Sequence, residues 1–98
     1  SKADKENDDY DTNRIEFVAE EASTRELVHQ DVVGMSKSDL RILRNWIFAK
    51  HGYIFKSKDL RKYFSNKSWY TPKYADVNSH LSKTERRNVQ FIKCYEDN

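Results

Sequence analysis

The chain has 98 residues, of which 37% are hydrophobic and 13% aromatic, which suffices for one small domain built around large rings. Its single cysteine, Cys94, excludes an intrachain disulfide and a cysteine-based metal site. No apolar run approaches the roughly 20 residues of a transmembrane helix, so we expect no membrane span in this chain. Residues 1–35 carry four Lys/Arg against ten Asp/Glu, whereas residues 36–98 carry fourteen against six. A basic segment of this kind suits an anionic partner, although basic residues spread over helices are more often a solvated surface.

The first third of the chain carries weak structural signals. Residues 1–13 are rich in Asp, Glu, Lys and Asn, and we interpret them as a flexible acidic linker. Residues 14–18 alternate between polar and apolar types, which favours a short strand or extended arm. Asp31 is expected to cap a single helical turn that ends at Gly34. The folded domain is expected to span residues 14–96.

A strong helix pattern follows from residue 37. Ser36 has the features of an N-cap, with Asp39 three residues later as a weaker form of the capping box. Apolar residues then recur with helical spacing up to Gly52, which supplies the left-handed residue beyond the helix end. We expect the rest of the chain to pack around this helix.

Two further helices and a loop complete the predicted fold. Ser57 is the expected N-cap of a short amphipathic helix, residues 58–64. Pro72 excludes helix at the preceding residue, so residues 68–74 are predicted to form an aromatic loop whose rings fill gaps in the core.

A capping box formed by Ser82 and Glu85 starts the last predicted helix, residues 83–95. The predicted fold class is therefore mostly α: a small three-helix domain with an extended N-terminal arm and an aromatic loop before the last helix. Its expected core consists of Leu40, Leu43, Trp46, Ile47, Tyr53, Phe55, Leu60, Phe64, Trp69, Val89 and Ile92.

The end of the main helix reads Phe48-Ala49-Lys50-His51-Gly52. This run resembles the signature of the YARHG domain, a small bacterial domain named for its Tyr-Ala-Arg-His-Gly sequence. The resemblance covers about residues 15–96. Supporting matches in the same order are Ser23-Thr24-Arg25, Leu27, Asp31, Ser68-Trp69-Tyr70, Pro72, Asn88 and Phe91-Ile92.

Two signature positions depart from the family pattern. Phe48 replaces the tyrosine and lacks its hydroxyl, and Lys50 replaces the arginine and lacks its planar five-donor fork. A packing or simple charge role survives both changes. The resemblance implies an extracytoplasmic domain of bacterial surface proteins or lipoproteins, with no established catalytic activity.

His51 is the residue that a catalytic interpretation selects, because an imidazole can act as acid or base near neutral pH. It has no partner evident in the sequence, although Cys94 as a nucleophile is conceivable. The alternative is that His51 bonds the backbone at the Gly52 turn and locks the helix exit. The three histidines are not paired at the spacing of zinc ligands, so we expect neither metal nor cofactor.

Arg44 and Asn45 are predicted to face away from the apolar side of the main helix. They either contact a ligand or anchor neighbouring segments, and local hydrogen bonding favours the anchoring role. Asn88 falls within the apolar arc of the last helix, which indicates a satisfied buried amide. Its expected partner is the aromatic loop.

Trp69, Tyr70 and Tyr74 resemble aromatic platforms that hold sugars or extended peptides. In a small domain such rings are more often core, because each buries a large area. A single exposed ring would favour the binding interpretation.

The function predicted from the sequence is a non-enzymatic, extracytoplasmic interaction module of a bacterial cell envelope. Its partner would be a cell-wall polymer, a peptide or an envelope protein. One alternative is a hydrolase or transferase that uses His51. Another is a basic helical domain that binds nucleic acid, which the lack of a recognisable base-reading motif disfavours. The candidate binding residues are Arg44, Asn45, Lys50, His51, Trp69, Tyr70 and Tyr74.

Overall fold

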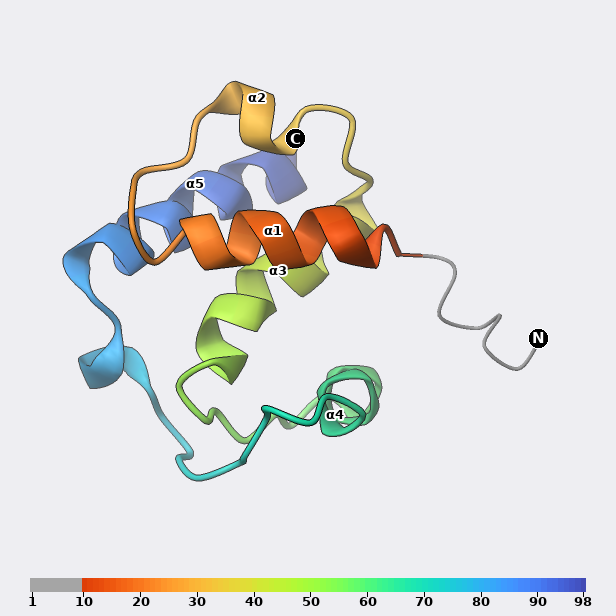
Figure 1. Ribbon diagram of the computed structural model, residues 1–98, viewed down its shortest axis with the longest axis vertical. Coiled ribbons are helices and arrows are strands. Elements are labelled where there is room, and N and C mark those ends of the chain that lie inside the picture. The colour runs from red at the N-terminus through yellow and green to blue at the C-terminus, as the bar shows by residue number, and fades with distance from the viewer. Residues whose placement is uncertain (1–9) are drawn as a thin grey trace.

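The computed structural model describes residues 10–98, which form five α-helices and a short 3₁₀ helix (Figure 1). The elements are α1 Thr12–Glu21, α2 His29–Val32, α3 Lys37–Ala49, α4 Lys58–Ser65, η2 Asn78–His80 and α5 Lys83–Asp97. The described range contains no β-sheet, only an isolated parallel bridge between Tyr53 and Tyr74. The mostly helical class is confirmed, and helices occur in all three predicted places. None of the described helices is long and apolar enough to cross a membrane.

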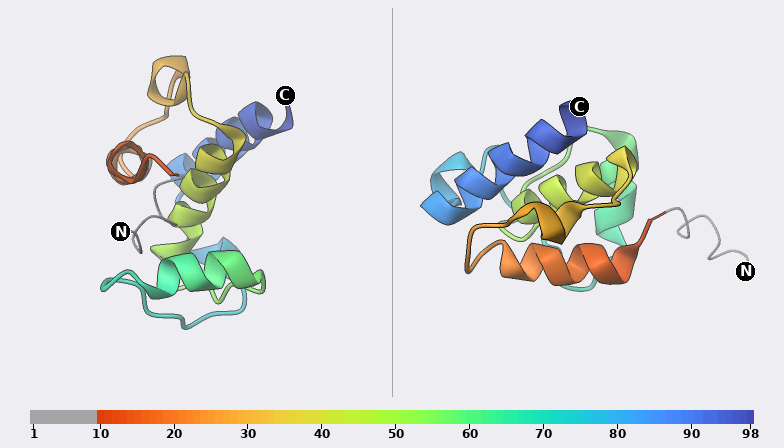
Figure 2. Two further views of the ribbon diagram at one scale, coloured as in Figure 1. Left: turned by 90° about the vertical axis from the view of Figure 1, so that its right-hand side faces the viewer. Right: turned by 90° about the horizontal axis from the view of Figure 1, so that it is seen from above.

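Helix α3 is the centre of the domain and contacts α1, α4 and α5. Figure 2 shows α4 at one end of the molecule and α2 at the other, with α3 running between them. Of the expected core residues, only three are not fully buried: Tyr53 and Val89 are half-buried and Trp69 is exposed. The predicted core is otherwise confirmed.

The prediction of an extended arm at residues 14–18 was wrong, because this segment lies within α1. Ile15, Val18 and Ala22 are buried at helical spacing, and the helix packs against α3. The alternation over five residues had suggested a strand, but the apolar pattern over the whole segment has the helical period. Residues 1–9 of the expected acidic linker lie outside the described residues, and α1 already begins at Thr12.

The predicted caps of the two long helices are confirmed. Ser36 Oγ accepts the Asp39 N–H at 3.0 Å at the start of α3. At the start of α5, Ser82 Oγ accepts the Glu85 N–H at 3.0 Å, while the Glu85 carboxylate accepts the Ser82 N–H at 2.9 Å. These reciprocal bonds satisfy backbone donors that have no partner within the helix.

Two expected caps differ in detail. Ser57 precedes α4, but its hydroxyl donates to Asp59 instead of accepting a helix N–H. Asp31 lies inside the single turn of α2 and accepts the Val28 N–H at 2.7 Å from there. The turn is followed by Gly34 with a φ of 84°, as expected.

Candidate functional site

The signature segment at the end of α3 connects three other parts of the domain. The chain leaves the helix through bonds from the His51 N–H to Phe48 O at 3.0 Å and from the Gly52 N–H to Ala49 O at 2.9 Å. Gly52 has a φ of 86°, the left-handed conformation that closes the helix. The Lys50 side chain then contacts α1, the His51 side chain contacts α5, and the Gly52 carbonyl contacts the aromatic loop.

Lys50 binds the end of α1. Its Nζ donates to Ala19 O at 2.7 Å and to the Ser23 hydroxyl. The Ser23 N–H donates to Glu20 O and not to Ala19 O, so Lys50 supplies the donor for Ala19 O. The positive charge of Lys50 also suits the negative end of the α1 dipole. Burial lowers the pKa of Lys50, against the raising effect of the Glu20 and Glu85 carboxylates. Lys50 therefore fixes α1 to α3.

His51 binds the start of α5. Its Nε2 lies 2.9 Å from Glu85 Oε1, and the Ser23 hydroxyl donates to Glu85 Oε2 at 2.8 Å. Burial raises the pKa of Glu85, which is only 4% exposed, but the bonds from the Ser82 N–H, Ser23 and His51 outweigh it and hold that pKa below its ordinary value. The prediction that His51 bonds the backbone was wrong, since its partner is a carboxylate 34 residues away.

Gly52 binds the aromatic loop. Its carbonyl accepts the N–H groups of Lys73 at 2.7 Å and Tyr74 at 3.0 Å, and the Ile54 N–H donates to Tyr74 O at 2.8 Å. A Cβ at Gly52 would lie 2.9 Å from Thr71 O, so the close approach of the loop also requires glycine. The loop is thus held by backbone bonds on the signature turn.

A hollow of about 300 Å³ opens between this turn and the loop, and we call it the aromatic hollow. Its polar and aromatic lining includes Lys50, His51, Trp69, Lys73, Tyr74 and His80. Trp69 is 42% exposed and Tyr74 is 40% exposed. The expectation that both rings fill the core was therefore wrong, and the structure has the exposed rings that favour a binding platform.

Each exposed ring is supported from one side. The Trp69 ring leans on the buried Trp46, with ring centres 5.4 Å apart. The Tyr74 ring stacks on His80 at 4.4 Å with an interplanar angle of 25°. Both rings are consequently held in place before any ligand arrives.

A second hollow, of about 280 Å³, lies on the α1 side of Trp69. Trp69 and Lys50 line both hollows, whereas Glu16 and Glu20 line only the second. None of the described residues that line the aromatic hollow carries a carboxylate. The electrostatic environment therefore changes from acidic to basic across the Trp69 ring.

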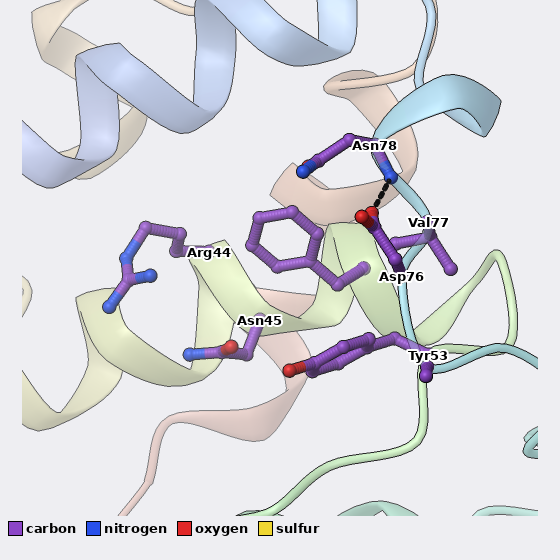
Figure 3. A pocket seen from close by; sticks show the side chains of 8 residues that line it. Arg44, Asn45, Tyr53, Asp76, Val77 and Asn78 are labelled. Atoms are coloured by element: carbon purple, nitrogen blue, oxygen red, sulfur yellow. Dashed lines mark hydrogen bonds between the residues drawn. The ribbon is translucent and has the colours of Figure 1, made fainter.

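Arg44 and Asn45 line a different hollow, of about 390 Å³, together with Tyr53 and Asp76 (Figure 3). The Arg44 guanidinium extends away from Asp76 and forms two hydrogen bonds to the Glu96 carboxylate. Asn45 Nδ2 donates to Arg41 O at 2.8 Å. The structure therefore separates both residues from the aromatic hollow and engages each in a bond within the domain, in line with the anchoring role.

Tyr70 is half-buried, and its hydroxyl donates to Tyr53 O at 2.5 Å. Burial raises the pKa of Tyr70. It supports the loop from inside and does not line the aromatic hollow. Of the predicted binding residues, the structure brings together Lys50, His51, Trp69 and Tyr74.

Asn88 is buried, as predicted, but its expected partner was wrong. Its Oδ1 accepts the Leu27 N–H at 2.8 Å, and its Nδ2 donates to Ala22 O at 2.7 Å and Arg25 O at 2.9 Å. The amide thus fixes the segment between α1 and α2, and not the aromatic loop. This makes Asn88 a structural residue.

Sequence reasoning missed three residues of this region. Glu85 was recognised only as a helix cap, and Ser23 only as a family match. His80 gave no signal, because its stacking on Tyr74 depends on how the loop returns. Within residues 10–98, the structure groups no three His, Cys, Asp or Glu side chains that could hold a metal ion.

Comparison with known proteins agrees with the predicted resemblance. A family model described as the YARHG domain matches residues 15–97, which is most of the chain. No curated protein and no solved structure matches the chain significantly.

Proposed function

This chain belongs to the YARHG domain family, and we propose that it is a non-enzymatic interaction module of a bacterial cell envelope. Its family is consistent with an extracellular module of unknown function, which supports an extracytoplasmic location. The ligand contacts the aromatic hollow and is a cell-wall polymer, a peptide or an envelope protein. The observation that carries this proposal is the exposure of Trp69 and Tyr74 beside Lys73 and the signature turn.

Most large rings of this small domain pack against the core, so exposed rings on a fixed loop call for an explanation. Trp69 and Tyr74 are held by ring contacts and by the backbone bonds to Gly52. A ligand that covers them buries apolar area, and little conformational entropy is lost, because the rings are already positioned. The signature residues Lys50 and His51 bind α1 and α5, so they contribute chiefly to the shape of the hollow.

Cosedimentation with isolated bacterial wall and envelope fractions tests the proposal. Trp69→Ala is expected to weaken binding by about tenfold or more, the loss typical of a hot-spot ring. Phe17→Ala is the matched control, because Phe17 is a 63% exposed ring on α1 that lines none of the hollows described above. Its binding should stay within about twofold of the original chain, since exposed isolated rings contribute little. Undiminished binding by a folded Trp69→Ala variant would contradict the proposal.

A second candidate function is a hydrolase or transferase that uses His51. The observation that favours it is that His51 lines the aromatic hollow with the Glu85 carboxylate 2.9 Å from its Nε2, an arrangement that can orient a general base. Both Glu85 oxygens, however, already accept bonds from Ser82 and Ser23. Release of soluble fragments from wall polymer, lost in a folded His51→Ala variant, would establish this alternative.

A further inference from the structure

We propose that the ligand of the aromatic hollow is an acidic glycan, a polymer whose sugar ring stacks on Trp69 while its carboxylate or phosphate group contacts Lys73 and His80. This inference rests on the proposed function and names the ligand class for the same hollow. Three features of the hollow carry it: unpaired basic side chains, a supported exposed ring and the separation of charge across that ring.

The basic side chains of the hollow differ in their availability. Lys50 and His51 are engaged, the first with Ala19 O and Ser23 and the second with Glu85. The side chain of Lys73, in contrast, makes no hydrogen bond or ion pair with any residue that the structure describes, and it is exposed. His80 stacks on Tyr74, and its ring nitrogens bond none of the described residues.

An anionic group in this hollow would therefore gain a direct partner in Lys73. No described carboxylate lines the hollow to compete for that ammonium. A bond between an ammonium and a carboxylate or phosphate is stronger than one between neutral groups. Lys50 adds positive potential at short range while remaining bound to α1.

The ring of Trp69 accounts for the sugar. One side of the indole leans on Trp46, while the exposed part borders the hollow. A pyranose presents an apolar C–H face that can cover such a ring, and its hydroxyl groups can bond the polar lining. Thr71 and His80 both line the hollow and carry groups that can bond those hydroxyls.

The distribution of charge around Trp69 also determines on which side of the ring the acid group of the ligand lies. Glu16 and Glu20 border Trp69 on its α1 side, so an acid group placed there would be repelled. The acid group therefore lies on the Lys73 side of the ring.

A peptide fits this surface less well. Addition of a strand requires a sheet edge, and residues 10–98 contain only an isolated bridge. Docking of an amphipathic helix requires an apolar groove, whereas the aromatic hollow is lined by Lys50, His51, Lys73 and His80.

The test uses purified bacterial wall polymer in three forms: untreated, with carboxylates amidated by carbodiimide and ethanolamine, and with phosphodiester-linked polymers removed by cold hydrofluoric acid. We expect one treatment or both to lower binding of the unaltered chain by about tenfold or more, since each acid group makes a charge-assisted contact. Loss on amidation identifies a carboxylate, and loss on acid treatment identifies a phosphate.

Charge reversal at Lys73 localises the effect. Lys73→Glu is expected to weaken binding to the untreated polymer by about tenfold or more, because a carboxylate then faces the acidic ligand. Lys58→Glu is the matched control, since Lys58 is an exposed lysine of α4 that lines none of the hollows described above. Binding of this variant to the untreated polymer should change by less than about twofold.

Equal binding to all three forms of the polymer would overturn the acidic-glycan inference and leave the proposed function intact. No binding to the untreated polymer, with binding to another envelope fraction retained, would likewise overturn only the inference. No binding to any wall or envelope fraction would instead count against the proposed function. Tighter binding to single-stranded oligothymidylate than to the wall polymer would also overturn the inference, because stacked rings and lysines can hold nucleic acid in the same way.

Discussion

His51 Nε2 lies 2.9 Å from Glu85 Oε1, so the turn that follows the central helix is bound to the carboxylate that caps α5. The same carboxylate accepts a bond from Ser23, which in turn accepts one from Lys50. This network joins α1, α3 and α5 at one point. It explains why the signature can be structural while the adjoining hollow supplies the binding surface.

The charge of Glu85 should stabilise the domain in a pH-dependent manner. Glu85→Gln keeps hydrogen-bonding atoms at this position but removes the charge. We expect it to lower the free energy of unfolding by about 1–2 kcal/mol at neutral pH. Because the folded-state pKa of Glu85 lies below its ordinary value of 4.5, its stabilisation is complete above that pH and is lost as the pH falls through the folded-state pKa. Urea unfolding at several pH values measures this effect.

The difference in unfolding free energy between the original chain and Glu85→Gln should therefore shrink on acidification. Glu26→Gln serves as the control, because the Glu26 carboxylate pairs with Arg87 at a solvent-exposed position. A constant difference between pH 7 and acid conditions would refute the assigned role of the Glu85 charge.

Replacing Gly52 should affect both the helix end and the aromatic loop. Gly52→Ala places a side chain at a φ of 86° and a Cβ 2.9 Å from Thr71 O. We expect a loss of more than about 1 kcal/mol in unfolding free energy, from the left-handed conformation alone. Gly34 has a similar φ, but a Cβ there would contact only the end of the Arg14 side chain, at 3.8 Å. We therefore expect Gly34→Ala to lower the free energy of unfolding by less than Gly52→Ala does.

Differential scanning calorimetry measures the melting temperatures of the two glycine variants, and we expect that of Gly52→Ala to be the lower. A melting temperature lower for Gly34→Ala than for Gly52→Ala would show that the contact with the loop carries no cost.

The amide of Asn88 should be among the most sensitive positions of the fold. Asn88→Ala removes three hydrogen bonds from a side chain that is 1% exposed and leaves Leu27 N–H, Ala22 O and Arg25 O without this partner. We expect a loss of at least about 2 kcal/mol in urea unfolding. Gln90→Ala on the same helix is exposed and should change stability by less than about 0.5 kcal/mol. Equal effects of the two substitutions would contradict the structural role of Asn88.

The family arginine should be tolerated at position 50. Lys50→Arg keeps a cation near Ala19 O and the Ser23 hydroxyl, so the melting temperature should remain within about 3 °C, the shift that corresponds to a fraction of a kcal/mol. Lys50→Met keeps a flexible apolar chain but removes the donor and the charge at the end of α1, and it should lower the melting temperature more strongly. Thermal unfolding followed by circular dichroism compares both variants, and equal melting temperatures for Met and Arg would show that the charge is dispensable.

The helix ends could be predicted from the sequence, because each depends on residues within a few positions of one another. The Ser36 cap, the Ser82–Glu85 capping box and the left-handed Gly52 follow from local geometry, and all three were confirmed. Helix α1 was missed because residues 14–18 alternate over a short window, whereas its burial pattern emerges only over the full ten residues.

The partners of polar side chains were not predictable in the same way. His51 and Glu85 are 34 residues apart, and Asn88 and Leu27 are 61 apart, so only the packing of α1 and α5 on α3 brings them together. The exposure of Trp69 likewise depends on how the loop is held by Gly52. The likeness of the loop to a binding platform was visible in the sequence, but the hollow beside it was not.

Nuclear magnetic resonance mapping tests the central claim that a ligand binds in the aromatic hollow, on the side formed by Trp69, Lys73 and His80. Soluble wall-polymer fragments would be titrated into the isotope-labelled chain while backbone amides and the two indole N–H signals are followed. The largest shifts are expected at the Trp69 indole, Lys73 and His80. Shifts centred on Arg44 and Asp76, with the Trp69 indole unchanged, would contradict the account.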